Sequence, residues 1–467
     1  MTSDTTQLKR LQGMFDAQKA AMAREPYPSL DQRLGRLATL RTMFAENLQL
    51  FRDTLAEDFG RIPPRMVDIL ETKAIIYRVA FFEANLAEWM KPQEIPVARK
   101  GGTARARILR LPKGVNGNIA PWNFAVESAF IMCADMLAAG NTAIVKPSEL
   151  APATAQALDE SVTKYFDPEV LAVVQGGPEL AATFSAMPWD HLTFTGSPRV
   201  GQIVMEAAAK NLVPVTLELG GKNPALFAAD GVTEDLVDRM FKFREMKAGQ
   251  VCTSPDYAMV PRDRLEDWVT MAGDCWRRTY PTYVGHPFAT SIINDAHFER
   301  LVGYLEEART RGVRVVSLNG EEPDPELRQI PLTLVVDPPE DLGCMTDEIF
   351  GPVLPVVPYD AVDEAMARIN AGPSPLGSYI ATQNEELAER FLHTVRSGGG
   401  AVNNFGSQGG SVNLPFGGIG RSGQGCHSGY EGFLNYSHTK SVFYGDKDPA
   451  SYDVLGPLPS DLKGQEV

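Results

Sequence analysis

The sequence lacks the features that mark membrane, secreted and metal-binding proteins. No stretch approaches the run of about 20 apolar residues that a membrane-spanning helix needs, and the N-terminus has no apolar signal core. No two cysteines stand at CxxC spacing and the histidines form no HExxH pattern, so we expect no bound metal. These absences predict a cytoplasmic protein that does not enter a membrane.

Positive charge is in deficit and cysteine is scarce. The formal net charge of −15 argues against nucleic acid or an anionic membrane as a partner, because both bind basic surfaces. The cysteines are odd in number and far apart, so we expect reduced thiols at Cys133, Cys252, Cys275, Cys344 and Cys426.

The periodicity of the apolar residues predicts an α/β protein. Residues 1–95 show helical spacing, with a capping-box pattern at Ser29 and Gln32, and are expected to be packing helices. From Gly114 to Gly221, and in a second block to Pro415, short apolar strands alternate with helices, as in parallel sheets. Ligands of such sheets bind at the carboxyl ends of the strands, so the turns there are the places to search.

Two alternating segments predict a pair of strands outside these sheets. Residues 104–111 carry three arginines at alternate or near-alternate positions, as expected for a solvent-facing arm. Residues 436–444 alternate again and are predicted to pair with that arm.

The turn after the predicted strand at 192–194 is a candidate phosphate site. Ser197 can cap the next helix and Pro198 suits its first position, so main-chain N–H groups there would face outward. A plain strand-to-helix turn is an equally good interpretation. The formal GxGxxG match at Gly418–Gly423 is rejected as a dinucleotide site, because it follows no strand and opens no helix.

Several polar residues are ambiguous when taken singly. Lys146 and Glu149 could bind the hydroxyls of a sugar, or they could belong to an exposed charged loop. Asn123 could be a turn former, Glu218 a surface strand residue, and Glu348 an acid at a helix end.

Cys252, in the glycine-flanked segment Lys247–Asp256, is the candidate nucleophile. A reactive thiol needs an accessible loop, a base or field that forms the thiolate, and donors for the oxyanion it creates. Taken alone, a cysteine is more often a small buried hydrophobe.

Seven segments together resemble the aldehyde dehydrogenase superfamily over nearly the whole chain, in order and spacing. They are Pro121–Phe124, Lys146–Glu149, Phe194–Ser197, Leu217–Lys222, Gly249–Cys252, Glu348–Val353 and Pro415–Gly418. The ending from Pro415 to His438 is most similar to the class 3 branch, which includes coniferyl-aldehyde-type enzymes.

The resemblance implies a fold with two parallel-sheet α/β domains and a β oligomerisation arm, and roles for three catalytic residues. Cys252 would attack the aldehyde, Asn123 and the Cys252 N–H would hold the oxyanion, and Glu218 would activate water to hydrolyse the thioester. The presence of Glu218 favours hydrolysis of the thioester over transfer of its acyl group to coenzyme A. The implied substrate is an aromatic or medium-chain aliphatic aldehyde.

The resemblance also implies a nicotinamide dinucleotide, NAD or alternatively NADP. Glu348 would bind the nicotinamide ribose, and Lys146 with Glu149 the adenine ribose. The full implied set of cofactor-binding residues is Lys146, Glu149, Gly196, Ser197, Trp122, Glu348 and Phe350. The aromatic residues Trp122, Phe124 and Phe405 could line an apolar funnel or belong to the core.

The departures from the family pattern lie near the thiol. Lys247 stands where asparagine is common, and Thr253 and Ser254 also differ. Lys247 could lower the thiol pKa, contact an acidic substrate or point to solvent.

The domain boundaries follow from the same resemblance. We expect a nucleotide-binding domain of residues 1–95 and 113–217, a catalytic domain of 218–420, and an arm of 96–112 and 430–446 that forms a homodimer. The competing functions are a catalytically inactive nucleotide-binding or structural member of the fold, and a cysteine hydrolase or acyltransferase with a histidine partner.

Overall fold

A six-stranded sheet forms one half of the molecule. The computed structural model describes residues 4–97 and 104–445. The strand order is β15-β7-β6-β3-β4-β5, with all neighbours parallel except β15, which pairs antiparallel with β7. The strands are β3 (Val115–Ile119), β4 (Thr142–Lys146), β5 (Leu171–Val173), β6 (His191–Gly196), β7 (Val215–Leu219) and β15 (Gly423–Gln424).

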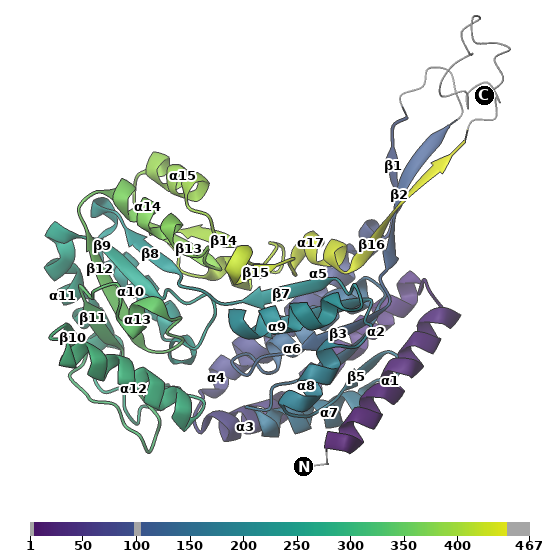
Figure 1. The fold of residues 1–467 in the computed structure, drawn as a ribbon, viewed down its shortest axis with the longest axis horizontal. Helices are drawn as coiled ribbons and strands as arrows, with labels where there is room; N and C mark the ends of the chain where they lie inside the picture. The colour runs from purple at the N-terminus through teal and green to yellow at the C-terminus, as the bar shows by residue number, and fades with distance from the viewer. Residues whose placement is uncertain (1–3, 98–103, 446–467) are drawn as a thin grey trace, which may run out of the picture.

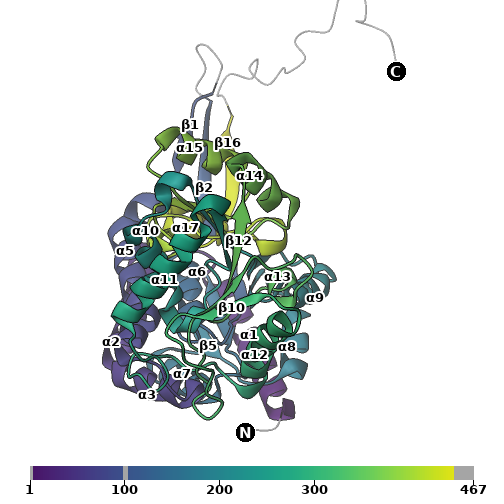
Figure 2. The ribbon, with the colours of Figure 1, turned by 90° about the vertical axis from the view of Figure 1, so that its left-hand side faces the viewer.

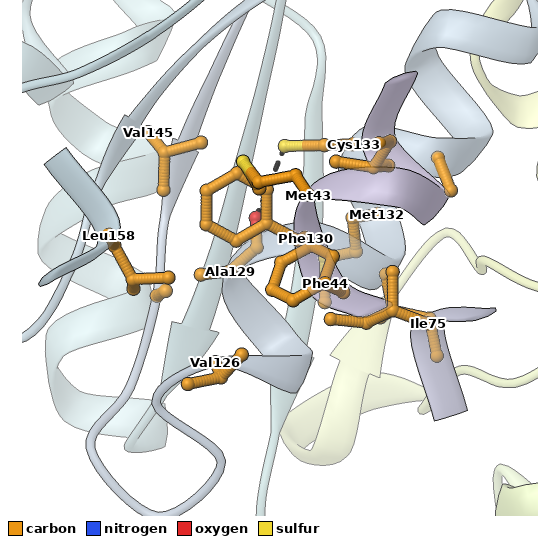
Figure 3. Close-up of a cluster of buried hydrophobic side chains, with 14 of the residues drawn as sticks. Met43, Phe44, Ile75, Val126, Ala129, Phe130, Met132, Cys133, Val145 and Leu158 are labelled. Carbon is orange, nitrogen blue, oxygen red and sulfur yellow. Dashed lines mark hydrogen bonds between the residues drawn. The ribbon is translucent and has the colours of Figure 1, made fainter. Parts of the chain in front are cut away.

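Helices cover both faces of this sheet (Figure 1). One face packs against α2 (Leu30–Glu46), α3 (Leu48–Phe59), α5 (Lys73–Trp89), α6 (Glu127–Ala138) and α7 (Pro152–Tyr165). The other face packs against α1 (Asp4–Arg24), α8 (Pro178–Ser185) and α9 (Pro198–Ala209). Figure 3 shows the first interface, where Phe130 and Phe44 pack together in one cluster with Val145 of β4 and Leu158 of α7. The predicted capping box at Ser29 and Gln32 is confirmed at the start of α2.

A seven-stranded sheet forms the other half. Its order is β10-β11-β12-β9-β8-β13-β14, with only β10 antiparallel to its neighbour. The strands are β8 (Pro224–Phe227), β9 (Tyr257–Pro261), β10 (Arg314–Ser317), β11 (Thr333–Val336), β12 (Val353–Tyr359), β13 (Gly377–Ala381) and β14 (Gly399–Val402). Both sheets confirm the predicted α/β fold class.

Side-chain alternation distributes the helices over this second sheet. Ala225 and Phe227 pack toward α10 (Glu234–Arg244) and α11 (Leu265–Thr279), while Leu226 packs toward α14 (Val362–Ala371) and α15 (Glu385–Thr394). Helix α12 (Asp295–Thr310) packs with the segment around α13 (Gly343–Thr346).

The predicted pairing of the arm is confirmed. Strand β16 (Ser437–Tyr444) runs antiparallel to β2 (Arg105–Pro112), with Ser437 opposite Pro112, and β1 (Gln93–Ile95) pairs with the other edge of β2. Both views show the arm extending from the body of the molecule (Figures 1 and 2). Residues 98–103 and 446 of the predicted arm lie outside the described residues.

Short elements complete the chain. They are α4 (Pro64–Val67), the π-helical turn η1 (Asp68–Thr72), the 3-10 turns η2 (Ala229–Gly231), η3 (Met246–Gly249), η4 (Arg262–Arg264) and η5 (Gly420–Ser422), and the helices α16 (Ser407–Gly410) and α17 (Gly429–Asn435). The rejected segment Gly418–Gly423 contains η5 and the first residue of β15. The domain boundaries stay a prediction.

Candidate functional site

Four of the predicted site segments lie at or just after the carboxyl ends of strands in the first sheet. Asn123 follows β3, Lys146 ends β4, Gly196 ends β6, and Glu218 is the fourth residue of β7. Because these strands are parallel, their carboxyl ends lie along one edge of the sheet. The fold therefore gathers residues that are distant in sequence.

The Cys252 loop lies at the amino edge of the second sheet, just before β9. The side-chain amide of Asn223, the residue before β8, donates hydrogen bonds to the carbonyl oxygens of Cys252 at 2.7 Å and Ser254 at 2.9 Å. Its oxygen accepts a bond at 2.8 Å from the N–H of Gly377, which begins β13. The Cys252 loop is thus fixed to the sheet by one buried amide.

Two further residues hold the Cys252 loop, and the sequence reasoning missed both. The buried guanidinium of Arg244 donates to the carbonyl oxygens of Pro255 and Gly351 and, at 2.9 Å, of Val353. The Tyr379 hydroxyl donates to the Thr253 carbonyl oxygen at 2.5 Å. Arg244 is one of several charged residues of α10, and Tyr379 is one residue of an apolar strand, so neither residue's place in the sequence reveals its partner.

A second set of contacts joins the remaining motifs. The Lys222 ammonium pairs with the carboxylate of Asp256, whose other oxygen accepts a bond at 2.9 Å from the Ile349 N–H. The Glu348 carboxylate accepts a bond from the Gly221 N–H at 3.1 Å. A Cβ at Gly220 would lie against the same carboxylate, so the Glu348 side chain packs directly on the main chain of this turn.

Asn123 connects the two halves of the site. Its side-chain amide nitrogen donates to the main-chain oxygen of Gln250 at 3.1 Å, two residues before Cys252. An amide nitrogen carries two protons, so a second N–H is available for an oxyanion beside the thiol. The structure therefore brings Asn123 to the Cys252 loop, the segment Lys247–Asp256 (also called the thiol loop below).

Glu218 is a buried residue of a central strand, so its interpretation as a surface strand residue is wrong. Val215, Leu217 and Leu219 pack with α8 and α9, which turns Glu218 to the opposite face by strand alternation. Neither carboxyl oxygen has a hydrogen-bond partner among the described residues. Burial, with the nearby Asp135 carboxylate, holds the pKa of Glu218 well above its usual value.

The environment of Cys252 is acidic. Burial raises the pKa of the thiol well above its usual value, and the carboxylates of Glu348, Glu127 and Glu218 raise it further. No histidine contributes to this shift among the described residues. The same burial raises the pKa of Glu348 to about 8 and that of Glu127 to about 7.

The predicted ribose residues form a pair at the end of β4. The Lys146 ammonium lies 2.8 Å from the Glu149 carboxylate, and the side chains are 2 % and 45 % exposed. The glutamate consequently presents a carboxylate to solvent beside a fixed cation. That arrangement fits the hydroxyls of a ribose.

The predicted phosphate turn is a capped helix start. Ser197 accepts a hydrogen bond from the Val200 N–H at 3.4 Å, with Pro198 at the first helical position of α9. A Cβ at Gly201 would lie 2.7 Å from Leu219, so the glycine lets α9 pack closely on β7. A helix start held this close to the strand ends suits a pyrophosphate.

The two predicted aromatic cofactor residues meet each other. The rings of Trp122 and Phe350 are 5.4 Å apart at an interplanar angle of 75°. The backbone of Phe350 is in the left-handed region, with a φ of 53°. Phe405 does not join them, because it is buried with Phe227 and Tyr379 in the core of the second sheet.

Lys247 does not point to solvent, and the prediction that it could do so is wrong. The side chain is fully buried and ion-paired with Glu71, which is also fully buried. Its ammonium also donates to the Asn123 carbonyl oxygen at 2.5 Å. Burial excludes the acidic-substrate interpretation as well. Glu71, in the segment expected only to pack, was missed by the sequence reasoning.

The described residues contain neither a metal-binding cluster nor a membrane-spanning helix. No cluster of three or more histidine, cysteine, aspartate or glutamate side chains could hold a metal ion there. No helix in the same ranges has the length and apolar character to cross a membrane.

Comparison with known proteins places the chain in a family. The sequence profile described as "Aldehyde dehydrogenase family" matches residues 7–442. A "Probable coniferyl aldehyde dehydrogenase" of Caulobacter vibrioides is 39% identical over 436 residues, which cover 92% of this chain and 90% of that protein. The human protein "Aldehyde dehydrogenase family 3 member B1" is 34% identical over 435 residues, which cover 93% of this chain and 90% of that protein.

A solved structure supports the same assignment. The Mycobacterium tuberculosis aldehyde dehydrogenase complexed with NAD+ superposes with a TM-score of 0.82 at 28% identity, over 93% of this chain and 89% of its own. The family profile covers most of the chain, and the identity to the Caulobacter protein extends over nearly its whole length. The chain belongs to the aldehyde dehydrogenase family.

Proposed function

We propose that the chain oxidises aromatic, coniferyl-like aldehydes, or medium-chain aliphatic ones, to carboxylic acids through Cys252. NAD(P)-dependent aldehyde oxidation is the activity of the family to which it belongs. The observation that carries the assignment of residues is the contact of the Asn123 amide with the Gln250 carbonyl, which brings an oxyanion donor to the thiol loop.

The first step is attack of the Cys252 thiolate on the aldehyde carbonyl carbon. The carbonyl oxygen becomes an oxyanion, and the free N–H of the Asn123 amide and the Cys252 main-chain N–H are its donors. The charged groups that act on the thiol are carboxylates. One of these carboxylates therefore serves as the base that accepts the thiol proton. The nicotinamide cofactor supplies the hydride acceptor when it is bound.

The second step is hydrolysis of the resulting Cys252 thioester. Glu218 accepts a proton from the attacking water, and collapse of the tetrahedral adduct releases the carboxylic acid and restores the thiolate. Burial without a hydrogen-bond partner raises the pKa of Glu218, which makes its carboxylate a stronger base than an exposed one. The same glutamate supports hydrolysis over acyl transfer to coenzyme A.

The residues present fit a nicotinamide dinucleotide. Lys146 and Glu149 would hold the adenine ribose, and Gly196 and Ser197 at the start of α9 would lie at the pyrophosphate. Glu348 would hold the nicotinamide ribose, with Trp122 and Phe350 beside it. The carboxylate of Glu149 favours NAD over NADP, because it repels a phosphate on the ribose 2′ position.

Two parts of the proposal concern the whole protein. A homodimer formed through the arm is supported by the length of the β2–β16 ladder and by Phe443, which is 61% exposed on β16. Location in the cytoplasm is supported by the five free cysteines, all of which lie in the described ranges.

The competing functions have less support. An inactive member would be expected to lose part of the constellation, whereas Cys252, Asn123 and Glu218 all lie where the strand ends meet the thiol loop. A cysteine hydrolase needs a histidine beside the thiol. The groups that shift the thiol pKa among the described residues are carboxylates.

One assay tests the proposal and separates it from both alternatives. NADH or NADPH formation is followed by absorbance with a panel of aromatic and aliphatic aldehydes, for wild type and Cys252→Ala. We expect turnover by wild type only, and the ratio of the panel rates ranks the substrates. Binding of NAD by folded wild type with no NADH from any aldehyde would favour the inactive member.

A further inference from the structure

The Lys247 ammonium has a complete set of partners in the protein interior. It is ion-paired with Glu71, donates to the Asn123 carbonyl oxygen at 2.5 Å, and lies 4.0 Å from the centroid of the Phe124 ring. Both charged side chains are fully buried. A lysine is rarely buried without such a set of contacts, so its position is determined by these partners.

Glu71 extends these contacts to the start of α6. Its second carboxylate oxygen accepts bonds from the N–H groups of Val126 at 3.1 Å and Glu127 at 2.9 Å. These are N–H groups of a helix start, which has no intrahelical partners for them. The ion pair therefore joins η1, the start of α6 and the turn that carries Asn123.

Lys247, Asn123 and Gln250 form a closed ring of hydrogen bonds. The Lys247 side chain donates to the Asn123 main chain, and the Asn123 side chain donates to the Gln250 main chain at 3.1 Å. The Gln250 side chain closes the ring by donating to the Lys247 main chain at 2.9 Å. Each residue thus fixes the main chain of the next.

The backbone around Lys247 makes this ring necessary. Lys247 and Ala248 have φ values of 50° and 54°, in the left-handed region, and Gly249 follows with 75°. Residues other than glycine hold this conformation at a cost, and only where their surroundings impose it. The strained turn leads directly into the segment that carries Gln250 and Cys252.

We propose that Lys247 is a positioning residue that sets the place of the Asn123 amide relative to Cys252, through its bond to the Asn123 carbonyl. The inference rests on the catalytic roles proposed above. The lysine acts on the oxyanion donor and not on the thiol, since its charge is neutralised by Glu71 and its protons face oxygens and a ring. This assigns a function to the departure from the asparagine common in the family.

The test separates the position of Asn123 from stability and from thiol reactivity. Lys247→Met removes the ammonium at similar length, and Lys247→Met with Glu71→Gln also removes the buried charge left behind. The matched control is Arg52→Met, which removes a less buried ion pair to Asp68 on the same η1 turn without contact to Asn123.

We expect kcat to fall by about 100-fold in Lys247→Met, the typical effect of losing one oxyanion donor. The double variant should recover thermal stability while kcat stays low, and Arg52→Met should stay within roughly fivefold of wild type. Alkylation of Cys252 by iodoacetamide requires no oxyanion donor. Its rate across pH should therefore change by less than about twofold in the double variant.

Three results would overturn the inference. These are a wild-type kcat in Lys247→Met, recovery of kcat together with stability in the double variant, or an alkylation rate that falls as far as kcat. An aldehyde assay in which wild type itself produces no NADH would instead reject the proposed function, and the inference with it. If Lys247→Met does not fold, the double variant and the alkylation rates decide.

Discussion

The side-chain amide of Asn223 holds the carbonyl oxygen of Cys252 at 2.7 Å. The same nitrogen bonds the Ser254 carbonyl at 2.9 Å, so one buried side chain fixes the main chain on both sides of Thr253. Its oxygen is itself held by the Gly377 N–H. The position of Cys252, whose main-chain N–H is a proposed oxyanion donor, consequently depends on a side chain outside the Lys247–Asp256 segment.

Replacement of Asn223 should therefore impair both stability and catalysis. In Asn223→Ala two carbonyls and one N–H lose their partners, and we expect a loss of about 1–3 kcal/mol in the free energy of unfolding. We also expect kcat to fall by at least about tenfold, because the thiol loop is no longer fixed. Urea unfolding and steady-state kinetics measure the two effects.

Asn370→Ala is the matched control for that variant. Asn370 is exposed and bridges the Thr394 carbonyl and the Arg396 N–H at 2.9 and 3.1 Å, so the chemical change is the same in a region remote from the thiol. It should leave kcat within about twofold of wild type. Equal loss of kcat in both variants would contradict the role given to Asn223.

Glu218→Gln should separate the two halves of the reaction. The amide has nearly the same volume but cannot accept a proton from water, so the thioester should accumulate. We expect a burst of about one NADH per subunit, followed by a steady rate reduced by roughly 10²–10⁴-fold. Rapid-mixing absorbance measures both phases, and Cys252→Ala should show neither. A steady rate equal to that of wild type would assign the base to another residue.

The fold and the main site residues could be predicted because their signals are local. Within the block from Gly114 to Gly221, where the sequence predicts short apolar strands, β3 (Val115–Ile119) has five buried residues between a glycine turn and a proline. Motif resemblance then placed Asn123 and Cys252 together, and the Asn123–Gln250 bond agrees. The β2–β16 pairing was likewise visible as alternation.

The surroundings of Lys247 could not be predicted, because its partner is distant. Glu71 lies 176 residues away in a π-helical turn of a segment that reads as packing helices. Lysine also has a strong preference for the surface, which misleads when a buried carboxylate compensates its charge. The same limit applies to Arg244, whose three carbonyl partners come from two other loops and the start of β12.

Glu149→Gln should change the choice of cofactor. The carboxylate lies 2.8 Å from the Lys146 ammonium, and its loss removes a repulsion and frees the cation for a 2′-phosphate. We expect the ratio of kcat/KM for NADP to that for NAD to rise by about tenfold, which corresponds to about 1.4 kcal/mol. Titration calorimetry with each dinucleotide checks this without an aldehyde.

The control for that comparison is Glu160→Gln, a change of the same kind at an exposed position of α7. It should leave the cofactor ratio unaltered. An unchanged ratio in Glu149→Gln would remove this residue from the proposed adenine ribose site.

Glu127→Gln should make the protein more stable at alkaline pH and the thiol more acidic. Burial first, and the Glu71 carboxylate second, raise the pKa of Glu127 from 4.5 to about 7 in the folded state. The folded protein therefore holds this proton more tightly than the unfolded chain. Stability due to this group is complete below pH 4.5 and is lost as the pH rises to about 7.

The glutamine cannot ionise, so the two proteins should be equally stable near pH 4.5, and the variant should be more stable at pH 8 by up to about 3 kcal/mol. The charge of Glu127 also raises the pKa of Cys252, so the pH profile of Cys252 alkylation should shift to lower pH in the variant. Glu364→Gln, at an exposed position of α14, should shift neither profile. A shift of the alkylation profile to higher pH would show that Glu127 serves instead as the base for the thiol, since its removal would then hinder deprotonation.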